Sequence, residues 1–407
     1  MYKILKSSFC YIVCNLQSYQ KHISQCLYGA KYLQYFTIQN ALNKTFLSKA
    51  SCTLTILLLL IFYGGCDSQK NFKPQHVYGK IEFNDKLDKP LVSSNQASAK
   101  LKNNAVITDN GLSHIRINEH ENLLYADSKQ WLIGDGCAGL LVIPLLYENN
   151  IAKLDRNNMK TIVTKGCVVS ASIKGDLVAG VLASNTLFLY DLAKDTFKFQ
   201  IKEESIYAIS SRHANPIILD TLVIFPTLDG RLNTIDITQG KSVKNIIVNT
   251  EKFLNNIIYL KVQKDELVSA THKRIYTLIH GESYGKELEI RDIYFDGTHI
   301  YALSLNGTIY QFDKTLATLQ SVKLPYANLN GIIIKKDHLY TFDNSGGYLI
   351  DLLLNDFSYE AFKLKFGIDR WFSKRVTMFY TPNIFYINNN ILNFNEALKK
   401  TIYENKK

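Results

Sequence analysis

The most familiar chemical motif in this sequence is a Gly-x-Ser-x-Gly pattern at residues 281–285, with His280 directly before it. In hydrolases such a serine becomes nucleophilic on a sharp turn between a strand and a helix, above a parallel sheet. Here the pattern lies between short β-type runs, where we expect the third and fourth strands of a small antiparallel sheet. We therefore predict an ordinary Gly-rich connection at these residues and no hydrolase centre.

Cysteine and histidine could supply redox or metal chemistry. Cys137 and Cys167 could form a disulfide in an oxidising compartment. Both lie in or next to predicted strands, where cysteine is usually a small buried apolar residue, and we favour that interpretation over the disulfide. After Cys66 the histidines are scattered, and no His-x-His, HExxH or CxxC motif occurs, so the sequence supports no metal site.

Aspartate recurs at equivalent points of the chain, directly after strand-like runs. Carboxylates that recur in successive repeats could suggest acid–base catalysis or Ca²⁺ binding. Repetition at one position favours a shared structural role, which is to cap backbone N–H groups of the turn that follows each strand. The residues concerned are Asp191, Asp236, Asp313 and Asp351.

Two segments, 210–215 and 365–375, contain the residue types that are enriched at protein-binding hot spots. We expect both in loops between sheets, where side chains are available to a partner. Packing of such a loop against its own domain is the alternative. The residues predicted to contact a protein partner are Arg212, His213, Arg370, Trp371 and Arg375.

The elements that must position these residues form a repeat. From about residue 104 onward, runs of four to seven Val, Ile, Leu, Tyr and Phe alternate with Asn-Gly, Asp-Gly and similar turns, and helix-period segments are nearly absent. A unit of turn, alternating strand and terminal residue recurs, ending at 144, 191, 236, 279, 313, 351 and 395. Its average spacing of about 42 residues is the period of a four-stranded propeller blade.

Such sheets can bury both faces only by stacking in a closed ring. Seven units, together with strand-like runs between 104 and 117, predict an all-β chain. The expected fold is a β-propeller of about seven four-stranded blades, with eight blades as the alternative.

The segment 236–241, Asp-Ile-Thr-Gln-Gly-Lys, resembles the end of the PQQ-type propeller repeat, which runs roughly Leu-Asp-x-x-Thr-Gly-Lys-x-x-Trp. Elsewhere the period persists and the motif does not; one repeat keeps only Asp191 and a Phe199 at the tryptophan position. PQQ-dependent enzymes of this family hold their quinone beneath a disulfide of adjacent cysteines, and this chain has no adjacent cysteines. The resemblance therefore implies the fold, while we predict no cofactor and no enzymatic activity.

The N-terminal region contains an export signal. A predominantly apolar run of ten residues, 54–63, follows Lys44 and Lys49. They are too few for a membrane span of about 20 residues, but they suit the apolar core of a signal peptide.

Gly65 and Cys66, directly after this run, resemble the lipobox of bacterial lipoproteins, although Tyr63 departs from the family pattern. The resemblance implies cleavage before Cys66 and diacylation of its thiol. Asp67 would then act as a sorting signal, because in enteric-type bacteria an aspartate at that place disfavours transfer to the outer membrane. A plain signal peptide or an uncleaved anchor, with an incidental cysteine, is the alternative.

We expect four parts along the chain. Residues 1–46 are an over-called start or a leader, and 47–65 are the lipoprotein signal peptide. Residues 66–103, rich in Lys, Asn, Asp and Ser, are predicted to form a flexible tether. Residues 104–407 are expected to form the propeller.

The formal charge of +11 could suggest nucleic acid, but residues 1–65 carry +6 of it and 66–407 only +5. The remaining charge of +5 is too small and too scattered for nucleic-acid binding. The architecture is similar to that of the propeller lipoproteins of the outer-membrane β-barrel assembly machinery. The sequence thus predicts a lipid-anchored, non-catalytic scaffold that faces the periplasm and binds envelope proteins of a membrane complex. A propeller enzyme with a cofactor or substrate in its central channel is the alternative.

Overall fold

The computed structural model describes residues 71–206, 209–366 and 376–403. All regular elements in these ranges are β-strands. No helix in the described ranges is long and apolar enough to span a lipid bilayer. The strands form eight sheets, which we number as blades 1 to 8 from the N-terminal end. The all-β propeller is confirmed, with the eight blades that the sequence left open as the alternative.

Five blades are antiparallel meanders of four consecutive strands. Blade 1 contains β3 (Leu91–Ser94), β4 (Ser98–Leu101), β5 (Ala105–Thr108) and β6 (Gly111–Arg116). Blade 3 contains β12 (Val168–Lys174), β13 (Leu177–Leu182), β14 (Thr186–Asp191) and β15 (Thr196–Lys202). Blade 4 contains β16 (Ile217–Ile218), β17 (Leu222–Pro226), β18 (Arg231–Asp236) and β19 (Ser242–Ile247). Blade 5 contains β20 (Tyr259–Gln263), β21 (Glu266–Ala270), β22 (Arg274–Ile279) and β23 (Glu282–Glu287). Blade 6 contains β24 (Ile290–Phe295), β25 (Ile300–Ser304), β26 (Thr308–Phe312) and β27 (Thr318–Lys323).

The other three blades carry additional or borrowed strands. Blade 2 contains β7 (Glu121–Ala126), β8 (Gln130–Asp135), β9 (Gly139–Glu148) and β11 (Lys160–Val163), with β10 (Ile151–Leu154) paired to the far end of β9. Blade 7 contains β28 (Leu329–Lys335), β29 (His338–Asp343), β30 (Tyr348–Leu353) and β31 (Tyr359–Leu364), extended by β1 (Gly79–Glu82) and β35 (Lys399–Ile402). Blade 8 contains β32 (Met378–Tyr380), β33 (Ile384–Ile387) and β34 (Asn390–Asn393), completed by β2 (Asp85–Lys86).

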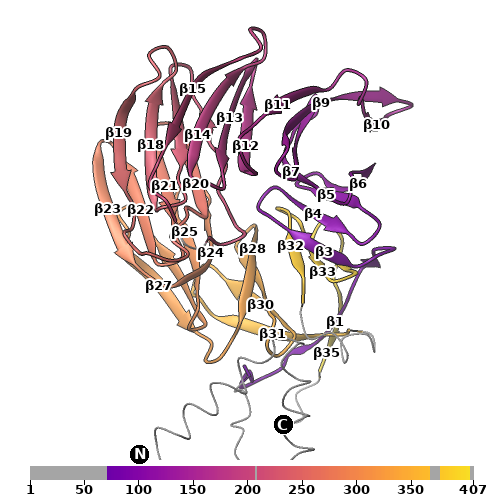
Figure 1. Cartoon of the computed structure of the whole chain (residues 1–407). Coiled ribbons are helices and arrows are strands. Elements are labelled where there is room, and N and C mark those ends of the chain that lie inside the picture. The colour runs from indigo at the N-terminus through magenta and orange to yellow at the C-terminus, as the bar shows by residue number, and fades with distance from the viewer. Residues whose placement is uncertain (1–70, 207–208, 367–375, 404–407) are drawn as a thin grey trace, which may run out of the picture. The chain divides into compact units, whose positions relative to one another are not determined.

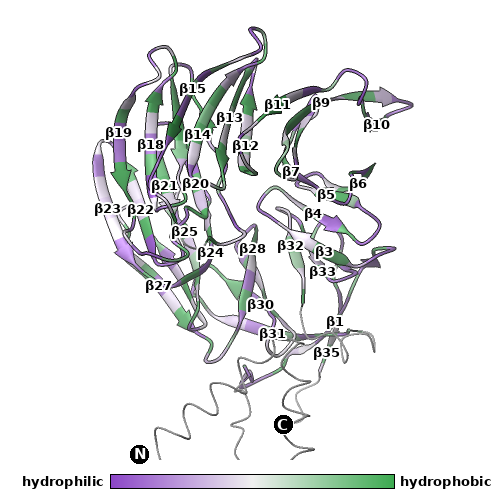
Figure 2. Cartoon of the chain, viewed as in Figure 1, coloured by the Kyte–Doolittle hydropathy of each residue, from purple (hydrophilic) through white to green (hydrophobic). Residues whose placement is uncertain are grey.

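The blades are arranged around a common axis, with the first strand of each blade nearest to it (Figure 1). Apolar residues concentrate in the inner and middle strands, while outer strands such as β23 and β27 are more polar (Figure 2). Eight buried apolar clusters hold the ring together, one between each pair of neighbouring blades. Because one of them joins blade 8 to blade 1, the hydrophobic effect stabilises the closed ring at every interface.

Segments from both chain ends close the ring. The N-terminal β1 pairs in parallel with β31, and the C-terminal β35 pairs with the other edge of β1. The next N-terminal strand, β2, supplies the outer strand of blade 8. Ile81 of β1 is fully buried in the cluster between blades 7 and 8, so the N-terminal segment is part of the core.

The predicted tether over 66–103 is therefore wrong for residues 79–101, which form β1 to β4. These strands are short, and sequences such as Leu-Val-Ser-Ser in β3 lack the apolar density of the later blades. The sequence pattern did not predict the two inner strands of blade 1, β3 and β4. It therefore favoured seven blades over eight.

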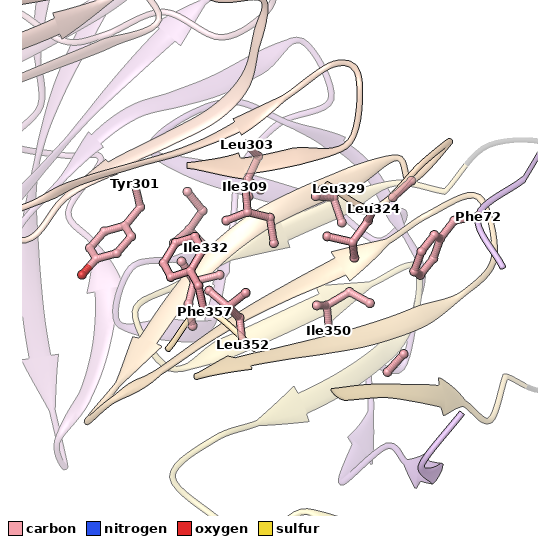
Figure 3. Close-up of a cluster of buried hydrophobic side chains, with 13 residues drawn as sticks. Phe72, Tyr301, Leu303, Ile309, Leu324, Leu329, Ile332, Ile350, Leu352 and Phe357 are labelled. Carbon is pink, nitrogen blue, oxygen red and sulfur yellow. The ribbon is translucent and has the colours of Figure 1, made fainter. Parts of the chain in front are cut away.

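Phe72 marks where the described chain joins the ring. Its side chain is 2% exposed and packs near Leu324 and Ile350, in the cluster between blades 6 and 7 (Figure 3). Its ring also makes an edge contact with Tyr348. Burial of a phenylalanine this close to the N-terminal end fixes the chain to blade 7 before β1 begins.

Most Asn-Gly and Asp-Gly signals lie in turns between strands, whereas Asn330-Gly331 lies within β28, at a register shift. Gly307, between β25 and β26, adopts a φ of 83°, which side chains rarely tolerate. A Cβ there would lie 2.2 Å from the carbonyl oxygen of Leu324. Glycine is thus required at this turn by the backbone angle. It is also required because Leu324, in the connection from blade 6 to blade 7, approaches so closely.

Candidate functional site at the ring axis

The connection that leads into blade 4 lies across the ring axis. We call residues 209–216 the axial loop. The amide of Asn215 donates a hydrogen bond of 3.0 Å to the carbonyl of Leu124, in the inner strand of blade 2. The backbone N–H of Ala214 donates to Ile257, just before blade 5, also at 3.0 Å. The axial loop therefore links non-neighbouring blades across the centre of the ring.

Arg212, predicted to contact a partner, extends from this loop to the inner strand of blade 6. Its Nη2 donates to Oδ1 of Asp292 at 2.8 Å, and its Nη1 donates to the carbonyl oxygen of Arg291 at 2.9 Å. The Asp292 side chain is only 2% exposed, and its Oδ2 accepts the N–H of Gly331 in blade 7. The guanidinium of Arg212 is thus engaged inside the ring by Asp292. This aspartate lies in a strand 80 residues further along the chain.

The electrostatics of this pair agree with an internal role. Burial by itself would lower the pKa of Arg212, but the carboxylate of Asp292 and the hydroxyl of Tyr380 outweigh burial and raise the pKa above its ordinary value. Burial and the charge of Asp292 also raise the pKa of Tyr380, well above the usual range. Arg212 therefore remains charged and Tyr380 neutral, which suits a polar lock between blades 4, 6 and 8.

His213, the second predicted contact residue, faces the other way and is held by Asn256. The side-chain oxygen of Asn256 accepts the N–H of Ser210 at 2.8 Å, and its Nδ2 donates to the carbonyl of Arg212 at 2.5 Å. These bonds fix the orientation of the amide, so Nδ2 is also the donor to Nδ1 of His213 at 3.1 Å. Burial lowers the pKa of His213 to about 4. The ring is therefore neutral near pH 7, with its proton on Nε2.

A cavity of about 440 Å³ lies beside the axial loop, which we call the axial cavity. Strands and connections of blades 1 to 3 form most of its wall, and the axial loop forms the rest. Its polar and small lining residues are Ser93, Ser94, Asn95, Ser98, Lys100, Asn122, Gly136, Cys137, Cys167, Ser211 and His213. Its apolar lining residues are Val106, Ile117, Leu123, Leu124, Val168 and Val169.

Cys137 and Cys167 are joined by a disulfide at the edge of this cavity. Cys137 is exposed in the turn between β8 and β9, and Cys167 directly precedes β12. Our interpretation of the pair as separate buried apolar residues is wrong, because the turn of blade 2 folds back over the connection to blade 3. The disulfide clamps this connection.

Three of the four recurring aspartates cap turns as predicted. Oδ1 of Asp191 accepts two turn N–H groups at 3.1 Å, and Asp236 and Asp313 accept equivalent pairs. Asp351 is different, because its carboxylate binds Nδ1 of His338 at 2.6 Å and Nζ of Lys400 at 3.3 Å. The additional strand β35 brings Lys400 over blade 7, so the prediction of a turn cap fails at this aspartate.

Other chemical groups are engaged in structural contacts. His120, Glu121 and Asp135 bring ligand atoms within 4.8 Å of one another. Both oxygens of Glu121, however, accept hydrogen bonds from Arg156 at 2.9 and 2.7 Å. Ser283 of the Gly-x-Ser-x-Gly pattern lies within β23, opposite Leu278, and so has no nucleophile turn.

A two-stranded ribbon extends from blade 2 beyond the other strands (Figure 1). It pairs residues 145–148 of β9 with β10 through a tight Asn149-Asn150 turn. Leu146, Tyr147 and Ile151 are 49%, 57% and 50% exposed. We call residues 145–154 the apolar ribbon; its outer strand β10 has no further strand beside it in the described sheet.

The remaining predicted site residues, Cys66, Asp67, Arg370, Trp371 and Arg375, lie outside the described residues. The sequence missed Lys100, Asn256 and Asp292. The available signal for Asp292 was its place, with Arg291, among the apolar residues of β24. The other two had none, because their roles depend on neighbouring blades.

These features define a closed eight-bladed propeller whose axis is crossed by the axial loop and its polar contacts, with the axial cavity beside the loop. Solved structures share this fold. BamB from Moraxella catarrhalis aligns with a TM-score of 0.54 and 17% identity, over 74% of this chain and 94% of that chain. The C-terminal WD40 domain of Sif2 aligns with a TM-score of 0.53 and 12% identity, over 78% of this chain and 99% of that domain. The resemblance to an assembly-machinery propeller is thereby confirmed at the level of fold.

Sequence comparison narrows the family. Plasminogen-binding protein PgbB of Helicobacter pylori strain J99 is 33% identical over 390 residues, covering 85% of this chain and 72% of the relative. The PgbB of a second Helicobacter pylori strain is also 33% identical, covering 85% of this chain and 71% of the relative. No family model matches the chain. The chain belongs to the PgbB family.

Proposed function

We propose that this chain is a non-catalytic, protein-binding propeller of the cell envelope and that plasminogen is its partner. The observation that carries the proposal is the 33% identity to plasminogen-binding protein PgbB along 85% of the chain. The alternative prediction is an enzyme whose site lies in the central channel. Charged side chains that could serve such a site are already paired, Arg212 with Asp292 and Glu121 with Arg156. This supports binding at the surface over chemistry in the channel.

We further propose a lipid anchor at Cys66, with Asp67 influencing its sorting. The Cys137–Cys167 disulfide supports export, because such bonds persist in oxidising compartments. Replacing Cys66 with Ala should release the protein from membranes and abolish labelling by palmitate. Protease treatment of intact cells then decides the orientation: a propeller that faces the periplasm is protected, whereas one that reaches plasminogen outside the cell is cleaved.

The apolar ribbon is the surface that we propose for the partner. Edge strands accept an additional strand from a partner, and exposed apolar side chains add affinity. The outer strands β23 and β27 are more polar (Figure 2).

Binding of plasminogen to the soluble chain beginning at residue 67 tests the function directly. Biolayer interferometry should show saturable binding that serum albumin does not reproduce. Changing Leu146 and Ile151 to Ser should weaken binding about tenfold or more, while Val243→Ser, at an exposed position of β19, should not. Absence of saturable binding by the folded wild-type chain would reject the proposed partner; equal loss in both variants would reject the ribbon.

A further inference from the structure

The axial cavity has an unusual charge balance. Among the described residues that line it, Lys100 is the single cation and there is no carboxylate. A cavity wall of this composition favours an anionic ligand, because a buried or half-buried cation is stabilised by an opposite charge.

Lys100 is held in place without being neutralised. Its Nζ donates to the carbonyl oxygens of Glu119 and Glu121, at 2.6 and 3.1 Å. Within the described ranges, no carboxylate lies within ion-pair distance of Nζ, and the nearby Glu121 side chain is committed to Arg156. The ammonium has three donors, so one N–H remains for a ligand.

His213 supplies a second donor. Asn256 donates to its Nδ1, so the proton lies on Nε2, and no protein acceptor for this N–H occurs among the described residues. The ring is neutral over the physiological range, since burial holds its pKa at about 4. It therefore provides a hydrogen bond to a ligand without depending on pH near neutrality.

Part of the wall is apolar, with Val106, Ile117 and Leu123 continuing into the core between blades 1 and 2. A cavity of about 440 Å³ accommodates a ligand of several heavy atoms with an apolar portion. A bare inorganic anion would leave this apolar surface uncovered.

We propose that the axial cavity is a binding site for a carboxylate attached to a small apolar group, with Lys100 supplying the charge and His213 a hydrogen bond. The site is independent of the plasminogen contact, which lies on the exposed ribbon. Two sources share this chemistry, a free short-chain acid and the C-terminal carboxylate of a peptide that ends in an apolar residue.

Matched probes test the proposal on the soluble chain. Hexanoate represents the free acid and N-acetyl-leucine the peptide end; hexanamide and N-acetyl-leucine amide are the neutral controls. Saturation-transfer NMR detects binding on the probe itself. Trp131, 4% exposed in the same cluster as Val106 and Ile117, adds a fluorescence signal in a Trp371→Phe background, because the chain has two tryptophans.

At least one acid should bind saturably in the millimolar range or below, and each amide about tenfold or more weakly. Lys100→Met should reduce acid binding about tenfold, whereas Lys102→Met, an exposed neighbour outside the cavity, should not. His213→Phe should weaken it as well. Circular dichroism confirms that each variant folds.

The two acids identify the source by their relative affinities. Binding of the amides as tightly as the acids would overturn the proposal, because the cavity would then recognise only apolar groups. Absence of saturable binding by either acid to the wild-type chain would also overturn it.

Discussion

Two ion pairs of equal length show how surroundings decide the contribution of a charge. Arg212 and Asp292 are 2.8 Å apart with Asp292 only 2% exposed, whereas Lys174 and Asp220 are also 2.8 Å apart but largely in solvent. Removing one partner of a buried pair leaves an uncompensated charge, which costs several kcal/mol, while exposed pairs contribute less than about 1 kcal/mol.

We therefore predict that Asp292→Asn lowers the free energy of unfolding by about 3 kcal/mol, since Arg212 loses its counter-charge at the axis. Chemical denaturation monitored by circular dichroism measures the change. Asp220→Asn is the matched control and should leave the free energy of unfolding nearly unchanged. Equal effects of the two substitutions would show that Arg212 is solvated and does not lock the ring.

A second residue-scale prediction concerns acid stability. The pKa of His213 is lowered by burial to about 4, whereas an unfolded histidine titrates near 6.5. Between these values the unfolded chain binds a proton that the folded chain does not, so stability rises with pH across this window and falls on acidification. The contribution of His213 amounts to about 2 to 3 kcal/mol between pH 6.5 and 4.

His213→Gln should remove this contribution, because glutamine offers Asn256 an acceptor but does not titrate. Free energies of unfolding measured at pH 4.5 and 7 give the difference for each variant. His114→Gln, at an exposed position of β6, is the control and should leave the difference unchanged. A wild-type slope that survives in His213→Gln would contradict the assignment.

At the scale of elements, the disulfide should stabilise the connection between blades 2 and 3. It closes a segment with a sequence separation of 30 residues, which by loop-closure entropy stabilises the folded state by about 3 to 4 kcal/mol. Reduction with dithiothreitol should lower the melting temperature of the wild type. The double variant Cys137→Ser with Cys167→Ser should melt at the lower temperature and be insensitive to the reductant; sensitivity in that variant would point to another cause.

The element pattern was readable from sequence wherever local signals sufficed. Alternating apolar runs separated by Asn-Gly and Asp-Gly turns identified blades 2 to 8, because each hairpin is encoded within a few residues. The strands β1 to β4 escaped because they are short, and because β1 and β2 are held by pairing with the distant strands β31 and β34.

The candidate site was less predictable for the same physical reason. Residue type indicated Arg212 and His213, but their orientation depends on Asp292 and Asn256, which other blades contribute. Cys137 and Cys167 likewise approach only after the turn of blade 2 folds back. No local pattern encodes such contacts, and therefore the sequence located the loop without revealing that it crosses the axis.

At the scale of the whole molecule, ring closure depends on the N-terminal segment. Ile81 is fully buried between blades 7 and 8, and Leu87 is 4% exposed between blades 8 and 1. Both residues lie in the stretch that the sequence predicted to be a tether. A tether would make their side chains dispensable, whereas a closed ring makes each a core residue.

Ile81→Ala and Leu87→Ala should each lower the free energy of unfolding by about 2 to 5 kcal/mol, as large-to-small core substitutions do. Val92→Ala, 50% exposed in the adjacent strand β3, should change it by less than about 0.5 kcal/mol. Because the ring closes through these contacts, the loss should reach distant blades. The fluorescence of Trp131 in blade 2, measured in a Trp371→Phe background, should therefore report the same shifted transition as circular dichroism. If Trp131 unfolds at its original midpoint while the dichroism signal shifts, blades 7 and 8 melt separately and the ring is not one cooperative unit.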